Sequence, residues 1–386
     1  MKALPDRAKD YVTRVLRAPG DVDARAWNEL LARSGGSPFM RHEYLAALHE
    51  SGSATADTGW DAHFLTLWHG DELQAACALY FKDHSYGEYV FDWAWANAYE
   101  QHGVRYYPKG LTAVPFTPVP GPRLLARDGA ARAALVAEVL TLCRRNKLSS
   151  FHLLFGNEDD IAACAAHGLM LRHTVQFHWT NAGWTDFDAF LASLAQEKRK
   201  KIRQERRKVA EAGVTFRALE GKAIATTDWD FFYRCYERTY LEHGNAPYLT
   251  RDFFRRMAAT MPENWLLFVA ERNGKRIASS LIGIADGVAY GRYWGALERV
   301  DSLHFEACYY QPLAWCIANG YRSFEGGAQG EHKMARALLP VKTSSAHWLA
   351  HPAFADAVEK FLAREGKGVE SYLQHLQERT PFRRED

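Results

Sequence analysis

Residues 290–336 read YGRYWGALERVDSLHFEACYYQPLAWCIANGYRSFEGGAQGEHKMAR, and this stretch decides the fold. The run 288–297, rich in glycine and aromatic residues, predicts a strand, and the apolar spacing i, i+4, i+7 predicts an amphipathic helix over 303–319. A second strand is expected at 321–324, and it leads into a slim loop, 325–333, that is rich in glycine and ionisable residues. This order predicts a ligand site at a strand end, because glycines let the backbone approach a ligand closely.

The two halves of the chain show the same predicted order of elements, β-α-α-β-β-β-α-β. A strong hairpin signal, RNGK at 272–275, belongs to the second half. We therefore expect an α/β protein made of two related units, residues 1–182 and 183–386. The second unit should begin with one amphipathic linker helix at about 187–210, whose outer face is basic because eight of the residues 198–208 are Lys or Arg.

Composition narrows the classes of partner. The net charge of +2, from 48 basic and 46 acidic residues, creates no global field, and we expect no DNA partner. The charged first sixteen residues do not form a secretion signal, and the apolar runs are too short to span a bilayer, so a cytoplasmic location is expected. Six scattered cysteines without a C-x-x-C pair predict buried free thiols and no metal site. The sequence does not indicate the oligomeric state.

Two short segments carry side chains suited to proton transfer. Catalytic candidates on the predicted helix 303–319 are His304, Glu306, Tyr309 and Tyr310. Those in the loop that follows are Glu325 and His332. Glu and His can accept a proton and Tyr can donate one, so these residue types suit general acid–base chemistry. The alternative is structural: an aromatic core with a satisfied histidine on the helix, and a mobile surface turn at the loop.

An aromatic stretch in the first half has two interpretations. Eleven of the 37 residues 80–116 are aromatic, which is too dense for an ordinary loop. They form either core with a hydrophobic lid or the wall of a binding groove for an acidic or phosphorylated substrate. The substrate-binding candidates from this stretch are Asp92, Trp93, Trp95, Tyr107 and Lys109.

Four longer strings resemble a known family. They are SPFMRHEYLAALHESG at 37–52, FDWAWANAYEQHGVRYYPKG at 91–110, VPFTPVPGPRLL at 114–125, and LHFEACYYQ with FEGGAQGEHK at 303–311 and 324–333. They are similar to the FemAB-like bacterial family labelled for peptidoglycan biosynthesis or recognition, whose members are assigned as GNAT-type N-acyltransferases. The resemblance covers nearly the whole chain and implies tandem GNAT-like units in a Fem-like architecture.

The resemblance also implies a reaction. An acyl group would pass from acyl-CoA, a co-substrate rather than a tightly bound cofactor, to an amine; Glu306 or Glu325 would act as base and Tyr309 or Tyr310 as acid. The implied substrate-binding residues of the second half are Gln329, Lys333 and Arg336. The implied cofactor-binding residues are Gly326, Gly327, Gly330, Arg199 and Arg203.

One departure from the GNAT pattern keeps two alternatives open. The stretch 296–304, ALERVDSLH, lacks the Q/R-x-x-G-x-G/A loop that usually holds the coenzyme A pyrophosphate. A Fem-like transferase that takes its aminoacyl group from tRNA, and acts on the amine of a cell-wall precursor, would not need that loop. A binding module without catalysis would not need it either.

Overall fold

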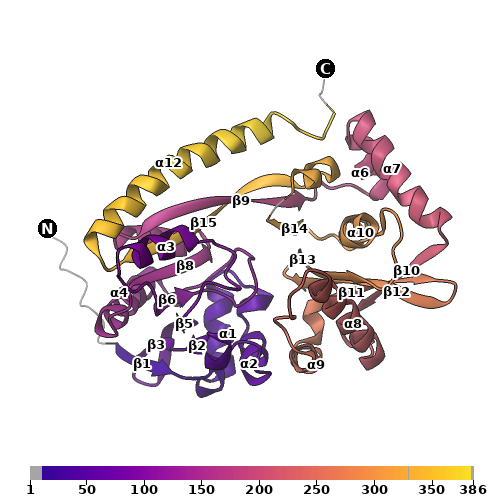
Figure 1. The fold of residues 1–386 in the computed structure, drawn as a ribbon. Helices are drawn as coiled ribbons and strands as arrows, with labels where there is room; N and C mark the ends of the chain where they lie inside the picture. The colour runs from indigo at the N-terminus through magenta and orange to yellow at the C-terminus, as the bar shows by residue number, and fades with distance from the viewer. Residues whose placement is uncertain (1–10, 329, 384–386) are drawn as a thin grey trace, which may run out of the picture. The chain divides into compact units, whose positions relative to one another are not determined.

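The computed structural model describes residues 11–328 and 330–383, with the side chain of Ala328 excepted, and shows two compact α/β units (Figure 1). Unit 1 comprises Met1–Arg172 and Ser344–Leu362, and unit 2 comprises His173–Thr343 and Ala363–Asp386. The chain therefore passes from one unit to the other inside strands β9 (Met170–Thr180) and β15 (Leu339–Leu349) and inside helix α12 (Pro352–Gln377). The sequence division at 182/183 falls just after β9, but it places the segment 344–362 in the second half.

Unit 1 contains two sheets. The first has the order β1-β3-β4-β7, and the second has the order β15-β8-β6-β5-β2. Their strands are β1 (Val12–Leu16), β2 (Asp61–Ala62), β3 (Phe64–His69), β4 (Glu72–Cys77), β5 (Leu79–Lys82), β6 (Lys109–Thr112), β7 (Leu125–Ala126) and β8 (Ser150–Gly156). The helices are α1 (Ala24–Arg33), α2 (His42–Glu50), α3 (Trp93–Gln101), α4 (Gly129–Arg145) and α5 (Glu158–Ala166). Apolar side chains of α4 and of strands β3, β4 and β8 form its main core.

Unit 2 follows the predicted element order. Its sheet has the order β10-β11-β12-β13-β14-β9. The strands are β10 (Val214–Glu220), β11 (Trp265–Arg272), β12 (Lys275–Ala285), β13 (Val288–Ala296) and β14 (Ser323–Ala328). The expected hairpin joins β11 to β12, and both of its turn residues, Asn273 and Gly274, have the positive φ angles that this turn requires.

Helices cover both faces of the unit 2 sheet. Helix α8 (Thr226–Glu242) lies on one face, and α10 (Leu303–Phe305) lies on the other, as Figure 1 shows. Helix α9 (Arg251–Thr260) packs on α8, and α11 (Gln311–Ala318) continues the chain after α10. The core of this unit joins α11 and α6 (Phe187–Ser193) to the sheet through residues such as Leu313, Phe190 and Phe324.

The predicted helix 303–319 contains a π turn, Glu306–Tyr310 (η6), between α10 and α11. Pro312 has no N–H, so it cannot donate to a carbonyl of the preceding turn, and the chain adopts a wider turn in which Gln311 N–H donates to Glu306 O. Ser280 Oγ donates to Ala307 O at 2.6 Å and so satisfies a carbonyl of this turn. Because of this wider turn, the ring of Tyr309 lies beside that of His304, whereas the hydroxyl of Tyr310 points to Glu205 of α7.

The linker helix predicted as one segment is two helices, α6 and α7 (Gln196–Glu211). The prediction was wrong because Leu194 and Ala195 adopt extended backbone between them. Leu194 pairs with Phe382, and Ala195 N–H donates to Pro381 O, so a C-terminal segment takes the hydrogen bonds that a continuous helix would have used.

The stretch predicted as a loop over 325–333 begins as strand, because β14 extends to Ala328. Glu325 pairs with His178 on β9, and the register shifts between Glu325 and Ala328, so Gly326 and Gly327 form a bulge. A 3-10 turn, η7 (Glu331–Arg336), follows. Gln329 lies outside the described residues.

Candidate active site

The candidate site of unit 2 is a split in its sheet. Strands β13 and β14 run parallel but pair over three positions only, ending at Tyr290 and Glu325. Beyond this pair a hollow of about 140 Å³ opens between the two strands, lined by Gly291 and Trp294 of β13 and by Phe324 and Gly326 of β14. Ligands of open α/β sheets bind at the carboxyl ends of parallel strands, which is where this hollow lies.

Helix α10 and the π turn supply the chemical groups of this hollow. His304, Cys308 and Tyr309 line it together. Burial and the neighbouring cations lower the pKa of His304 to about 4, so this imidazole is neutral near pH 7. Burial raises the pKa of Tyr309, so its hydroxyl is protonated near pH 7.

A second hollow, of about 340 Å³, lies on the α8 face of the same strand. Residues 292–294 of β13 line both hollows. The remaining lining residues of the second hollow are Tyr236, Thr239, Tyr240, His243 and Asn245. The two hollows therefore approach one strand from opposite faces of the sheet, next to the point where β13 and β14 diverge.

Glu325 lies at this point of divergence. Neighbours on a strand point to opposite faces, so Glu325 points away from Phe324 and Gly326, which line the first hollow. Its Oε2 is 3.9 Å from Nε2 of His178, and burial lowers the pKa of that histidine to about 4. Of the two predicted bases, Glu325 is the one beside the split.

Glu306 and Tyr310 are placed on the α7 side of the π turn. Glu306 accepts hydrogen bonds from Arg206 at 3.2 Å and from Gln311 at 2.7 Å, and burial raises its pKa although these partners oppose the shift. Tyr310 donates to Glu205, whose carboxylate also pairs with the buried Arg336.

The turn η7 packs against the same region. Lys333 is buried and donates to Gly326 O at 2.6 Å, which holds the bulge of β14, and burial lowers its pKa to about 8. The guanidinium of Arg336 lies 3.7 Å from the centroid of the Phe305 ring. His332 is exposed, and its ring centroid is 6.3 Å from that of Tyr309.

The glycines predicted to bind a cofactor have different roles. A side chain at Gly326 would meet Leu338 Cδ2 at 2.3 Å, so packing requires this glycine. Gly327 and Gly330 have φ angles of 74° and 94°, which favour glycine. Only Gly326 of the three lines the hollow.

Helix α7 carries the predicted basic face. It buries Ile202, Glu205 and Val209 and exposes most of its Lys and Arg side chains. Arg203 lines a groove of about 520 Å³ together with Arg206 and Arg207. Arg199 donates to Ala192 O at 3.4 Å and is not among the residues that line this groove.

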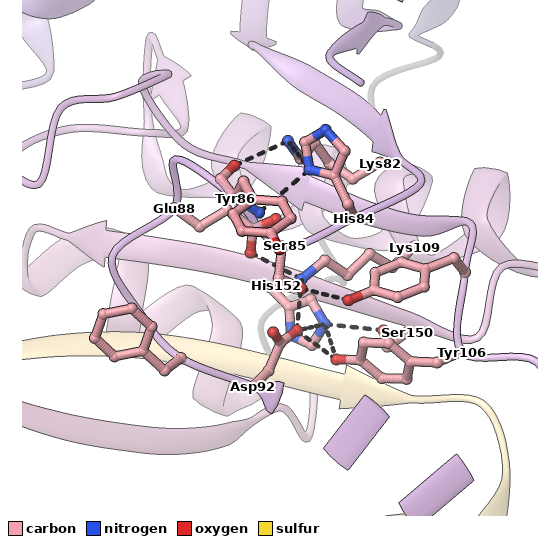
Figure 2. Close-up of polar contacts among 12 residues, drawn as sticks. Lys82, His84, Ser85, Tyr86, Glu88, Asp92, Tyr106, Lys109, Ser150 and His152 are labelled. Carbon is pink, nitrogen blue, oxygen red and sulfur yellow. Dashed lines mark hydrogen bonds and ion pairs between the residues drawn. The ribbon is translucent and has the colours of Figure 1, made fainter. Parts of the chain in front are cut away.

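In unit 1 the aromatic stretch encloses a buried polar cluster, shown in Figure 2. The ammonium of Lys109, on β6, donates to Ser85 at 2.7 Å, to Glu88 at 2.8 Å and to Asp92 at 2.5 Å, and its side chain has no exposed surface. Burial alone would lower the pKa of Lys109, but the two carboxylates raise it. Tyr106 also donates to Asp92, at 2.6 Å.

The predicted substrate-binding residues of unit 1 differ in burial and in hydrogen bonding. Lys109 and Asp92 bind each other, so their predicted role toward a substrate stays a prediction. Tyr107 is half-buried, with its hydroxyl 2.8 Å from Ser85 Oγ. Trp95 is buried at 5% exposure, whereas Trp93 is exposed.

The parallel pair of unit 1, β6 and β8, is followed by a further bridge. Gly121 pairs with Gly156, the last residue of β8, and its N–H donates to Phe155 O at 3.0 Å. The buried Arg123 fills the adjacent space by donating to the carbonyls of Val119 and Leu154. The hollow described above belongs to the parallel pair of unit 2.

Two further findings concern residues 11–328 and 330–383. No helix there is both long enough and apolar enough to cross a membrane. No group of three or more His, Cys, Asp or Glu side chains there is placed to hold a metal ion.

Several residues around the two hollows were not identified from the sequence. Arg292 is one, and Tyr236 and Tyr240 of α8 are others. Residues 233–240 read YRCYERTY, with tyrosines at i, i+3 and i+7. This helical spacing is a periodic signal, but the same stripe is equally expected of a helix that packs on the core. Arg292 gave none, because its position depends on a bulge in β13.

The profile of the FemAB-like family, described as peptidoglycan biosynthesis/recognition, matches residues 19–384. The chain belongs to the FemAB-like family. This membership confirms the resemblance seen in the sequence and supports acyl or aminoacyl transfer as the class of reaction. Comparison with curated protein sequences finds no significant match.

Solved structures agree with the FemAB-like fold. The C-terminal domain of an Agrobacterium fabrum protein assigned as a lysylphosphatidylglycerol synthetase has a TM-score of 0.55 at 11% identity, over 89% of this chain and 97% of its own. FemX has a TM-score of 0.53 at 10% identity, over 88% and 98%. L-PGS from Bacillus licheniformis has a TM-score of 0.54 at 10% identity, over 88% and 97%. The predicted Fem-like architecture of tandem GNAT-like units is confirmed.

Proposed function

We propose that this FemAB-like protein transfers a small acyl group from acyl-CoA to an amine, at the split between β13 and β14. The observation that carries the proposal is the hollow at the carboxyl ends of this parallel pair, lined by His304 and Tyr309. Its volume of about 140 Å³ fits a short acyl group better than a long chain. The proposed location is the cytoplasm, where acyl-CoA is available.

In the proposed mechanism the acyl carbonyl lies in the hollow, and the amine approaches from the α8 face. The amine nitrogen attacks the carbonyl carbon, and its proton passes to Glu325, directly or through water. The carbon–sulfur bond then breaks, and Tyr309 donates its proton to the leaving thiolate. The Glu325 proton returns to Tyr309 through solvent, so the enzyme is restored. His304 and His332 orient the substrates in this scheme.

The loop before α10 has only some of the features expected of a loop that binds the coenzyme A pyrophosphate. It has no glycine, but its two acidic residues are neutralised: Glu298 pairs with Arg272 at 2.5 Å, and Asp301 pairs with Lys208 at 2.7 Å. These pairs reduce the repulsion that the loop would exert on a pyrophosphate.

The basic face of α7 favours a second candidate, transfer from aminoacyl-tRNA to the amine of a cell-wall precursor. Exposed Lys200, Arg203 and Arg207 would contact the phosphate backbone. The family description, peptidoglycan biosynthesis/recognition, supports the same acceptor class. In this case the bond that breaks joins the carbonyl carbon to the ribose oxygen.

A thermal-shift titration with coenzyme A, acetyl-CoA and a long-chain acyl-CoA tests the donor. Occupancy at a hundredfold above Kd adds about 2.7 kcal/mol to the free energy of unfolding. A saturating shift with acetyl-CoA supports the proposal. No shift with any of them contradicts it, and the second candidate is then tested with aminoacyl-tRNA and a variant in which Arg199, Lys200, Arg203 and Arg207 are neutralised.

Tyr309→Phe and Glu325→Gln test the chemistry through release of the free thiol. Each should lower kcat on the order of 100-fold or more with little change in donor binding. Tyr310→Phe and Glu306→Gln are the matched controls, because the structure places these side chains on the α7 side. Equal losses in both pairs would refute the assigned acid and base.

A further inference from the structure

The hollow on the α8 face has an unusual balance of charge for a site that receives an amine. Tyrosine rings form much of its wall, and the rings of Tyr236 and Tyr240 lie 4.8 Å apart. Arg292 is its permanent cation, and no Asp or Glu side chain lines it. An ammonium group would therefore find no counter-ion among the lining residues.

Arg292 owes its place to a bulge. The register between β12 and β13 shifts so that Leu281 pairs with Tyr293 and Ile282 with Gly291, which makes Arg292 the extra residue of a bulge in β13. Its guanidinium lies 4.9 Å from the centroid of the Tyr293 ring and donates to the hydroxyl of that residue at 3.2 Å. The bulge thus directs a cation to the strand segment that both hollows share.

This electrostatic arrangement has two consequences for an acceptor. A nearby guanidinium disfavours the ammonium form of a bound amine, and only the neutral amine can attack a carbonyl. The same guanidinium binds a carboxylate strongly, because charge-assisted hydrogen bonds to Arg are short and can be bidentate. The tyrosine wall offers a surface for an apolar or aromatic side chain.

We propose that the acceptor is an amine that carries a neighbouring carboxylate, such as an amino acid with an apolar or aromatic side chain, and that Arg292 determines this specificity. The inference rests on the proposed function for the identity of the bound molecule as an acceptor. The carboxylate binds Arg292, the side chain packs on Tyr236 and Tyr240, and the amine then lies beside the split in the sheet. Arg292 is a specificity-determining residue in this scheme and transfers no proton.

The test compares two probes that share a ring and an amine and differ in the carboxylate: L-phenylalanine and 2-phenylethylamine. Their Kd values are measured by ligand-observed NMR on the full chain without any acyl donor. Wild type should bind phenylalanine about tenfold more tightly or better, since a hydrogen bond to a charged group contributes on the order of tenfold to a hundredfold in affinity. Arg292→Met should abolish this preference, and Arg292→Lys should keep part of it.

Arg238→Met is the matched control, because Arg238 lies on α8, pairs with Glu242 and is not among the residues that line the hollow. It should keep the preference for phenylalanine. Equal or tighter binding of 2-phenylethylamine to wild type, an unchanged preference in Arg292→Met, or no binding of either probe would overturn the proposal. Because no donor is present, the result does not depend on acyl transfer. A failure of the proposed function would instead appear as absent thiol release.

Discussion

Replacement of Lys109 by Met should strongly destabilise unit 1. The lysine side chain is fully buried, and the side chains of its partners Glu88 and Asp92 are 2% and 4% exposed. Methionine has a similar length but no charge, so the change leaves two carboxylates in the core without their ammonium. Removing one member of a buried ion pair costs about 3–5 kcal/mol, a large part of the 5–15 kcal/mol that stabilises a typical domain.

The effect can be measured locally as well as globally. Urea unfolding followed by circular dichroism gives the loss of stability. Native-state hydrogen exchange of the amides of 83–92, the loop that carries Ser85, Glu88 and Asp92, reports the cluster itself. A loss of 3 kcal/mol should speed the exchange of these amides by on the order of 100-fold.

A surface pair and a rescue variant complete the experiment. Arg25→Met removes an exposed ion pair with Glu29 in the same unit, and it should cost less than about 0.5 kcal/mol. Asp92→Asn in the Lys109→Met background removes one stranded carboxylate and should recover part of the loss. If Lys109→Met lowers the free energy of unfolding by less than about 1 kcal/mol, and the slope of that free energy against urea concentration is unchanged, then the two carboxylates do not need the ammonium of Lys109 and the prediction is wrong.

Two further predictions concern pH and packing. Burial raises the pKa of Glu88 to about 7, so the folded protein holds a proton there that the unfolded chain releases. The stability from this group is complete below about pH 4.5 and is lost as pH rises towards 7. Glu88→Gln should remove this contribution and leave that of Asp160, whose pKa burial also raises to about 7, so denaturant midpoints should change less with pH than in wild type. A methyl group at Gly295 would lie 1.9 Å from Cys235 O on α8, so Gly295→Ala should lower the free energy of unfolding by about 3 kcal/mol. Gly366→Ala, at a helical position with no atom within 4 Å, should raise the free energy of unfolding by about 0.5–1 kcal/mol. Equal effects of the two substitutions would contradict the close packing of β13 on α8.

Local patterns in the sequence were sufficient for the element order of unit 2 and for part of its site. The hairpin of β11 and β12 follows from Asn273 and Gly274, which accept positive φ angles at low cost. The helix that carries His304 and Tyr309 follows from apolar spacing, and the second strand of the split was expected at 321–324, just before Glu325. Glycines, β-branched residues and helical periods act within a few residues, so a linear reading detects them.

The tertiary structure decided which of the predicted residues share a hollow. His304 and Tyr309 face the same space because the chain makes a π turn over Glu306–Tyr310 that no apolar period predicts. Tyr310, one residue later, instead donates to Glu205 of α7, whose carboxylate pairs with Arg336.

The break between α6 and α7, the bulge that places Arg292, and the pairing of Lys109 with Asp92 were likewise decided by tertiary contacts. Each depends on contacts between separate elements, as when Leu194 pairs with Phe382. The sequence by itself determined the local elements and the residue types available for chemistry. The tertiary structure alone decided which of these residues meet, because satisfying buried polar groups across distant segments outweighs local preference.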